Sequence, residues 1–342
     1  MEPRLRPEFS RRCVYLLWVL ILWPALCFGQ VPDLLDQAKK EGEVVLYTTM
    51  TVGDFEAFKK AAKEKYPFLN IRHVYVSSAR QAARVTQEHR AGRVQADVLG
   101  NSLEAMLYFK QQGILSAYRS PEASNLIRGV WDAEGFWSGM TTDLLVTGFN
   151  PKAISRAAVP KNYEEYLKAQ FKGEMAVNRG VPYPFTGMVS LKGEEQGIAY
   201  LKKLSQQELR LIEGFTHMTN LLVAGEYPLA IFAQVSKVDA MRRKGAPADW
   251  LPSSPTFATI STVALTKNPL HAAAARLLVD FYLSVEGQQA LVRAGKIPLR
   301  RGVKSPSKEI DQLLESENLH VIGAEGEYSR YMKLYNEILG VR

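Results

Sequence analysis

The sequence predicts an α/β protein built from two compact units. Strand and helix patterns alternate three times between residues 43 and 113, which is typical of a mostly parallel sheet with helices on its faces. A second α/β region begins after Pro151. The chain has 342 residues, and chains of this length usually fold around more than one core.

The elements of the first unit follow from hydrophobic spacing and turn residues. A helix carries Phe55 and Phe58 on one face, and Pro67 ends it. In order, we expect helix 33–41, strand 43–47, the helix with Phe55, strand 69–76, a helix from Ser77-Ser78 to residue 92, strand 96–99 and a helix that ends at Gly113.

The second region begins with the apolar stretch 140–150. In order, we then expect strand 174–177, the loop 182–187 with a helix after it, a helix over 219–224, the strands 229–233 and 258–265, and an amphipathic helix over 272–283. Both regions therefore alternate strands with helices.

Hydroxyl and amide side chains follow each strand of the first unit. They are Thr48 and Thr49, Ser77 and Ser78, and Asn101 and Ser102. Ligands of such sheets bind beyond the carboxyl ends of the strands, where helix N-termini favour anions. We therefore expect one shared site, although each residue alone could be only a helix cap.

Charged and aromatic candidates extend this site. Arg80 could form a bidentate pair with a carboxylate or phosphonate, or it could be a solvated residue of the first helical turn. In the loop 182–187 we expect Tyr183 to line the site, Thr186 to donate to an anion, and Gly187 to allow close approach of the backbone. Alternatively, the rings of this loop only cover a core.

The N-terminus has the pattern of a secretory signal peptide. Four arginines between residues 4 and 12 precede an apolar run over 14–28. The run is shorter than the ~20 residues of a membrane span, so we expect removal of residues 1–29 and a periplasmic or secreted protein. The alternative is an uncleaved anchor that tethers the chain to the membrane, with Trp18 and Trp23 at the interface.

Composition and motifs argue against several classes of function. The formal net charge is +8 and falls to about +6 without the signal. The sequence contains no block of five like charges, so we expect no nucleic-acid partner. Cys13 and Cys27 both lie in the signal, so we expect no disulfide or thiolate metal site. No G-x-S-x-G, H-E-x-x-H or P-loop motif occurs. We therefore expect neither an enzyme nor a cofactor.

Five segments together resemble the bacterial extracellular solute-binding proteins of ABC importers, in the branch related to ferric-ion-binding proteins. They are residues 44–49, 91–98, 225–231, 267–275 and 281–288. No single motif is specific, and the resemblance depends on their order and spacing.

The resemblance implies a type 2 periplasmic-binding-protein fold, with two lobes that close on a solute as rigid bodies. Lobe 1 is then expected to comprise residues 31–140 plus 263–342, and lobe 2 residues 147–257. The hinge strands are expected near 141–146 and 258–262. Thr142, from the first crossing, joins the candidate site.

One departure from the family concerns the ligand. Iron-binding members carry two adjacent tyrosines after the strand equivalent to 229–233, where this chain has Ala233-Gln234-Val235-Ser236. Gln234 and Ser236 offer neutral hydrogen-bonding groups, which favours an organic solute over ferric ion and implies no metal site.

Three functions remain open at this stage. The leading hypothesis is a monomeric periplasmic protein that captures a small organic anion and delivers it to a membrane permease. The second is a sensor of the same fold that feeds a signalling partner. The third is a secreted enzyme on this scaffold, for which the sequence offers no nucleophile–base pair.

Overall fold

One mixed sheet runs through the described part of the chain, which is residues 33–127, 129–322 and 328–341 of this computed structural model. The main strand order is β2-β1-β3-β9-β5-β8-β6-β7. The strands are β1 (Glu43–Thr48), β2 (Asn70–Tyr75), β3 (Val98–Ser102), β4 (Leu115–Ser116), β5 (Ser138–Phe149), β6 (Met175–Asn178), β7 (Arg210–Ile212), β8 (Leu229–Gln234), β9 (Asp249–Thr266), β10 (Ile297–Pro298) and β11 (Leu319–Val321).

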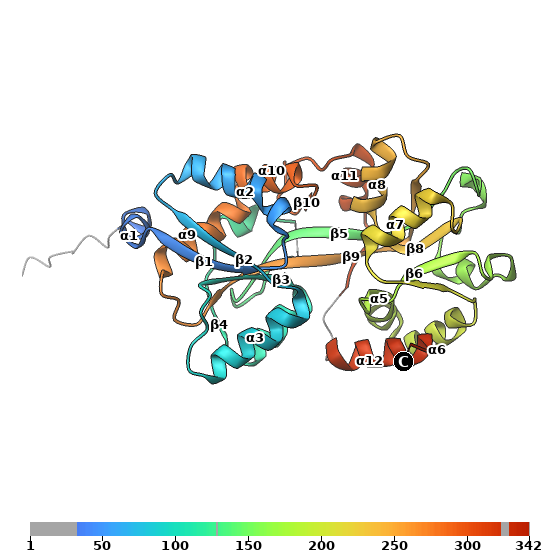
Figure 1. Cartoon of the computed structure of the whole chain (residues 1–342), viewed down its shortest axis with the longest axis horizontal. Helices are drawn as coiled ribbons and strands as arrows, with labels where there is room; N and C mark the ends of the chain where they lie inside the picture. The colour runs from blue at the N-terminus through green and yellow to red at the C-terminus, as the bar shows by residue number, and fades with distance from the viewer. Residues whose placement is uncertain (1–32, 128, 323–327, 342) are drawn as a thin grey trace, which may run out of the picture. The chain divides into compact units, whose positions relative to one another are not determined.

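Two parallel groups of strands are joined by two long antiparallel strands. β1 pairs in parallel with β2 and β3, and β6 pairs in parallel with β7 and β8. β5 and β9 run antiparallel to each other and connect the two groups (Figure 1). This arrangement confirms the predicted α/β class, and the two long strands contain the expected hinge segments.

Helices cover both faces of the sheet. In Figure 1, α2 and α3 lie on opposite sides of β1–β3, and α8 and α5 lie on opposite sides of β5 and β8. The α-helices are α1 (Leu34–Glu41), α2 (Val52–Lys65), α3 (Ser78–Arg90), α4 (Leu103–Gln111), α5 (Tyr183–Lys192), α6 (Glu194–Ser205), α7 (Phe215–Ala224), α8 (Val235–Arg243), α9 (Ala272–Leu283), α10 (Val285–Arg293), α11 (Lys308–Leu314) and α12 (Tyr328–Leu339). No described helix is long and apolar enough to cross a bilayer.

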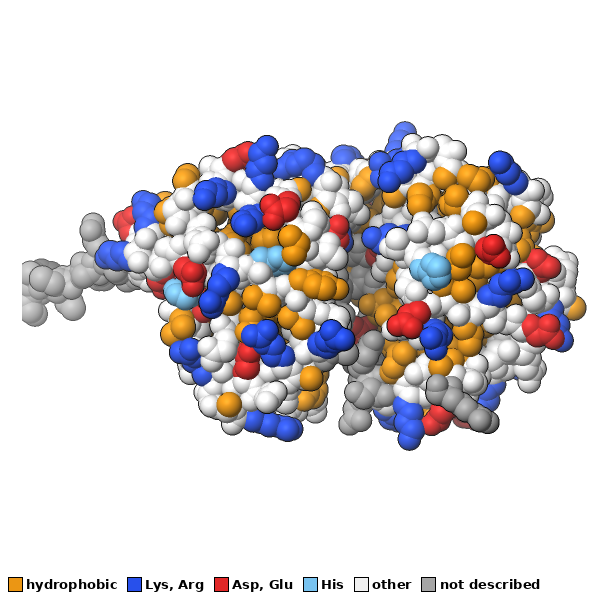
Figure 2. Space-filling model, viewed as in Figure 1, with side chains coloured by type: hydrophobic (Ala, Val, Ile, Leu, Met, Phe, Trp, Pro, Cys, Tyr) orange, Lys and Arg blue, Asp and Glu red, His pale blue; other side chains and the backbone are white. Residues whose placement is uncertain are grey.

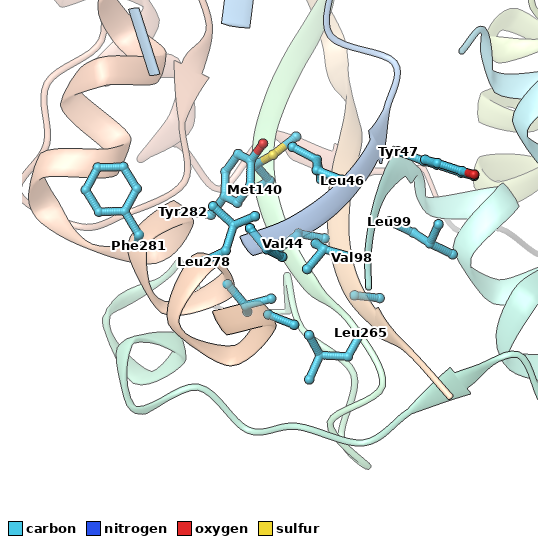
Figure 3. Close-up of a cluster of buried hydrophobic side chains, with 14 of the residues drawn as sticks. Val44, Leu46, Tyr47, Val98, Leu99, Met140, Leu265, Leu278, Phe281 and Tyr282 are labelled. Carbon is cyan, nitrogen blue, oxygen red and sulfur yellow. The ribbon is translucent and has the colours of Figure 1, made fainter. Parts of the chain in front are cut away.

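The first hydrophobic cluster lies around β1 and β3. It joins these strands to α2, α9 and α10, and Figure 3 shows Leu46, Met140, Leu278 and Tyr282 within it. Phe58 of α2 stacks on Tyr282 with ring centroids 4.0 Å apart. The predicted apolar face of α2 is therefore buried as expected.

The other clusters lie on the two faces of the sheet around β5 and β8. Leu145 and Phe257 belong to the cluster beneath α5 and α6, whereas Leu144 and Val238 belong to the cluster on the α8 face. Residues 34–342 nevertheless form one compact unit, because β5 and β9 pass without a break between the two regions.

The C-terminal helices differ from the sequence-based expectation. Ile310 of α11 and Tyr335 of α12 are buried with the clusters of the second region, although we expected all of 263–342 in lobe 1. We therefore propose that, of the described residues, lobe 1 comprises 34–127, 129–140 and 263–304, and lobe 2 comprises 144–258, 305–322 and 328–341.

Two local predictions are corrected by the structure. The predicted loop 182–187 is the start of helix α5, with Pro182 at its N-cap and Pro184 in its first turn; proline is tolerated there because the first N–H groups of a helix have no intrahelical acceptor. Asn101 and Ser102 belong to β3 and not to a loop. The signal peptide and both cysteines lie outside the described residues.

Candidate functional site

The candidate site lies where the carboxyl ends of the two parallel groups meet the long strands. β3 ends at Ser102, which pairs with Ser261 of β9. β8 ends at Gln234, which pairs with Leu145, and Leu145 pairs with Phe257 of β9. The two edges are thus four residues apart along β9, or about 13 Å at ~3.3 Å per residue. Figure 2 shows the molecule hollowed between its two halves.

Three of the predicted residues meet on the lobe 1 side. Asn101 is fully buried, and its side chain accepts from the Ser78 hydroxyl at 2.7 Å and from the Ser102 N–H at 2.7 Å. Its amide also donates to Gln81 at 2.8 Å. These bonds fix the starts of α3 and α4 relative to each other, so Asn101 organises this edge of the sheet.

Thr48, the last residue of β1, and Thr49 after it are also held by internal hydrogen bonds. The buried Thr48 hydroxyl accepts from the Met50 N–H at 3.2 Å, and the Thr49 N–H donates to the Gly100 carbonyl at 3.3 Å. A Cβ on Gly100 would lie only 2.8 Å from the Thr48 oxygen. Glycine is therefore required for β1 and β3 to approach here.

The start of α3 differs from the other helix starts of this edge. Thr51 caps α2 and Ser102 caps α4 through their side chains, whereas Ser77 makes no such bond at the start of α3. Ser77 is exposed, as is Arg80 in the first turn of the same helix. The N-terminus of α3 therefore presents its N–H groups beside a guanidinium group.

The corresponding helix starts of lobe 2 are tied together by Asn178. Its side-chain oxygen accepts from the Gly180 N–H at 2.9 Å and from the Gly214 N–H at 3.0 Å. These loops lead into α5 and α7, whose N-termini carry no side-chain cap. Tyr183 stacks on Phe215 across the two helices, with centroids 6.3 Å apart.

Three predicted site residues make structural contacts within the protein. The buried Thr186 hydroxyl donates to the Pro182 carbonyl at 3.2 Å within α5. Gly187 faces the Phe257 ring, which a Cβ would approach to 2.5 Å. The Thr142 hydroxyl donates to the Thr259 carbonyl at 2.9 Å between the hinge strands. The hydroxyl groups of Thr186 and Thr142 therefore donate within the protein, and Gly187 packs against Phe257.

Asp143 is a candidate site residue that the sequence analysis missed. It lies in β5, and its carboxylate accepts from the Ser236 hydroxyl, from the Ser236 N–H at 3.2 Å and from the Leu144 N–H at 3.0 Å. Gln234 at the N-cap of α8 makes no side-chain cap bond, so Asp143 caps this helix from the neighbouring strand. Burial raises the pKa of the Asp143 carboxyl, and the Ser236 bonds oppose the rise.

Two further residues near these edges were missed. Tyr75 is the last residue of β2 and remains 51% exposed, which is unusual for an aromatic side chain. Glu104 lies in the first turn of α4, and burial raises the pKa of its carboxyl. Two signals in the sequence could have indicated these residues: Glu104 is a carboxylate inside an apolar run, and Tyr75 is an aromatic residue at the end of a strand.

Comparison with known proteins identifies the class. Residues 96–329 match the family described as bacterial extracellular solute-binding protein, and the chain belongs to this family. Its members act in the periplasm or outside the cell, where they bind small solutes and work with the permease of an ABC importer.

Individual relatives are distant. The iron-bound HitA structure from Pseudomonas aeruginosa is 20% identical, with a TM-score of 0.75 over 86% of this chain and 99% of that one. AfuA from Actinobacillus pleuropneumoniae, with fructose-6-phosphate bound, is 20% identical, with a TM-score of 0.66 over 87% and 96%. An uncharacterised Haemophilus influenzae protein is 22% identical over 75% of this chain and 78% of its own length. These structural matches show the two-lobed fold.

Proposed function

We propose that this protein binds a small organic anion between its lobes and delivers it to a membrane permease. The observation that carries the proposal is the set of helix starts without a side-chain cap, those of α3, α5 and α7, at the facing strand edges. Helix N-termini attract anions through their N–H groups and dipoles. The exposed Arg80 adds a full positive charge on the lobe 1 side.

The side chains favour an organic anion over ferric ion. HitA was solved with iron and AfuA with a sugar phosphate, so this fold accommodates both kinds of ligand. At the start of α8 this chain has Gln234-Val235-Ser236, which offers no phenolate for a hard ferric ion. We propose that the protein acts as a monomer without its signal peptide and performs no chemistry on the solute.

Calorimetric titration with phosphate monoesters, alkylphosphonates and di- and tricarboxylates tests the proposal. Removal of one partner of a desolvated charge pair costs about 2–5 kcal/mol, so Arg80→Ala is expected to weaken the tightest ligand at least ~30-fold. Arg80→Lys should recover part of this loss, because an ammonium lacks the planar two-point contact.

Arg90, exposed in the last turn of α3, provides the matched control. Arg90→Ala should bind like the wild type, because residue 90 lies at the opposite end of the helix from the strand edge. Equal affinity of all four proteins would remove Arg80 from the site. Failure of every anion to bind the wild type would contradict the proposed function.

A further inference from the structure

The position of Asp143 follows from the strand register. Thr142 pairs with Ile297 of β10, and Leu145 pairs with Gln234 of β8. Residues 143 and 144 therefore lie in the gap between these two neighbours of β5, where α8 begins. Since successive side chains of a strand alternate faces, Asp143 lies on the same face of β5 as Leu145, which belongs to the cluster beneath α5 and α6.

Among the described residues, no side chain of opposite charge donates a hydrogen bond to Asp143. Its three hydrogen-bond donors are the Ser236 hydroxyl and two backbone N–H groups, all of them neutral. The charge of Lys237 lowers the pKa of Asp143, yet Lys237 forms no ion pair with Asp143 among those of the described residues. The N-terminus of α8 stabilises this carboxylate through its N–H groups and its dipole, so a cation of the solute would be its first partner with a full charge among the described contacts.

This carboxylate also determines where a solute anion can bind. The N-terminus of α8 is occupied by an anion of the protein itself, so a second anion there would be repelled. A solute anion is thereby directed to the starts of α3, α5 and α7. A carboxylate has about four lone-pair positions, and Asp143 uses three of them. One position remains for a donor on the solute.

We propose that Asp143 is a specificity-determining residue that pairs with an ammonium group of the solute. The proposal rests on the proposed function and narrows its ligand class to organic anions that also carry an amino group. Charge-assisted hydrogen bonds are roughly twice as strong as neutral ones, so the amino group would distinguish this solute from an otherwise identical anion.

Matched pairs of probes test this in the wild type without any substitution. Calorimetric titration would compare phosphoethanolamine with ethyl phosphate, and glucosamine 6-phosphate with glucose 6-phosphate. In at least one pair the amino compound is expected to bind ten-fold or more tightly than its partner. Equal binding, or preference for the compounds without nitrogen, would overturn the proposal while the proposed function stands.

The variant Asp143→Asn then assigns the preference to this residue. Its amide oxygen can still accept from the Ser236 N–H, so the cap of α8 is largely kept while the charge is lost. The amino compound is expected to lose about ten-fold in affinity, and the compound without nitrogen to change less than three-fold. Equal losses for both compounds would overturn the proposal, because they indicate a structural role alone.

Two further variants control for folding. Asp132 also accepts backbone N–H bonds, from Glu134 and Phe136, and lies in the loop before β5; Asp132→Asn should leave the ratio of affinities unchanged. Ser236→Ala keeps the Asp143 charge, removes one internal donor, and should preserve or increase the preference for the amino compound. Loss of the preference in Ser236→Ala would count against the carboxylate. If neither these probes nor any of the anions that test the proposed function bind, the proposed function itself fails.

Discussion

Substitution of Gly187 by alanine separates a packing role from a ligand-binding role. A Cβ at this helical position would lie 2.5 Å and 2.6 Å from two ring carbons of Phe257. Phe257 is fully buried and stacks on Tyr163, with ring centroids 4.8 Å apart. The ring of His320 also packs against Phe257, with centroids 5.6 Å apart. The phenyl ring therefore cannot retreat without moving its neighbours.

The expected cost follows from two opposing effects. An additional methyl group in a well-packed core costs about 1–3 kcal/mol, and the short distances place Gly187→Ala at the upper end. Alanine is better than glycine in a helix by about 1 kcal/mol. The variant should therefore lose about 2 kcal/mol of unfolding free energy, which corresponds to a few degrees of melting temperature.

Urea denaturation of Gly187→Ala and Gly53→Ala provides the measurement. Gly53 lies in the first turn of α2, and its Cβ would meet nothing within 4 Å, so Gly53→Ala should be neutral or slightly stabilising. Equal stability of the two variants would refute the packing argument. A weakened solute affinity without a loss of stability would restore the original expectation that Gly187 serves the ligand.

Four further outcomes are expected. Gln288 is fully buried, and its side-chain amide forms hydrogen bonds with the backbone of Met140, Tyr282 and Leu299. Gln288→Ala should lower the free energy of unfolding, measured by urea denaturation, by about 2–4 kcal/mol. A decrease below about 0.5 kcal/mol would refute the stabilising role of these bonds. Burial raises the pKa of Glu104 in the folded protein, so the unfolded chain loses this proton at a lower pH, and the stability falls as the pH rises from the unfolded pKa to the folded pKa. Glu104→Gln should therefore raise the melting temperature more at pH ~7.5 than at pH ~4. Equal increases at the two pH values would contradict this. Burial lowers the pKa of His73 in the folded protein, so the neutral imidazole contributes stability above pH ~6.5, and this stability is lost on acidification. His73→Phe should therefore reduce the fall in melting temperature between pH ~7 and pH ~5. An unchanged fall would count against this argument. The intact mass of exported protein should correspond to a chain without residues 1–29, whereas retention of the N-terminal arginines would show an anchor.

Local pattern was sufficient for the elements of the first unit. The apolar spacing around Phe55 and the hydroxyl-rich strand ends depend on neighbours in sequence, and α2, β1 and β3 were predicted. The start of α5 was predicted wrongly because two prolines indicate a loop, although proline is also allowed in the first turn of a helix. The place of α11 and α12 could not be predicted, because an amphipathic helix can pack on either lobe.

The candidate site was predicted only where one rule of topology decides it. Parallel strands end at the same edge, so the meeting of Ser78 with Asn101 could be expected. Asp143 caps α8 through Ser236, which lies 93 residues later in the chain. That contact depends on the register between β5 and β8, which no local pattern reveals.

Native mass spectrometry of the protein tests the central claim most directly. The protein would be released from the periplasm without refolding and, where it carries no solute, incubated with a whole-cell metabolite extract. The account predicts a 1:1 complex with a small organic anion, which is lost on mild activation. A chain that stays unliganded in the extract, or that binds ferric ion in place of an organic solute, would contradict it.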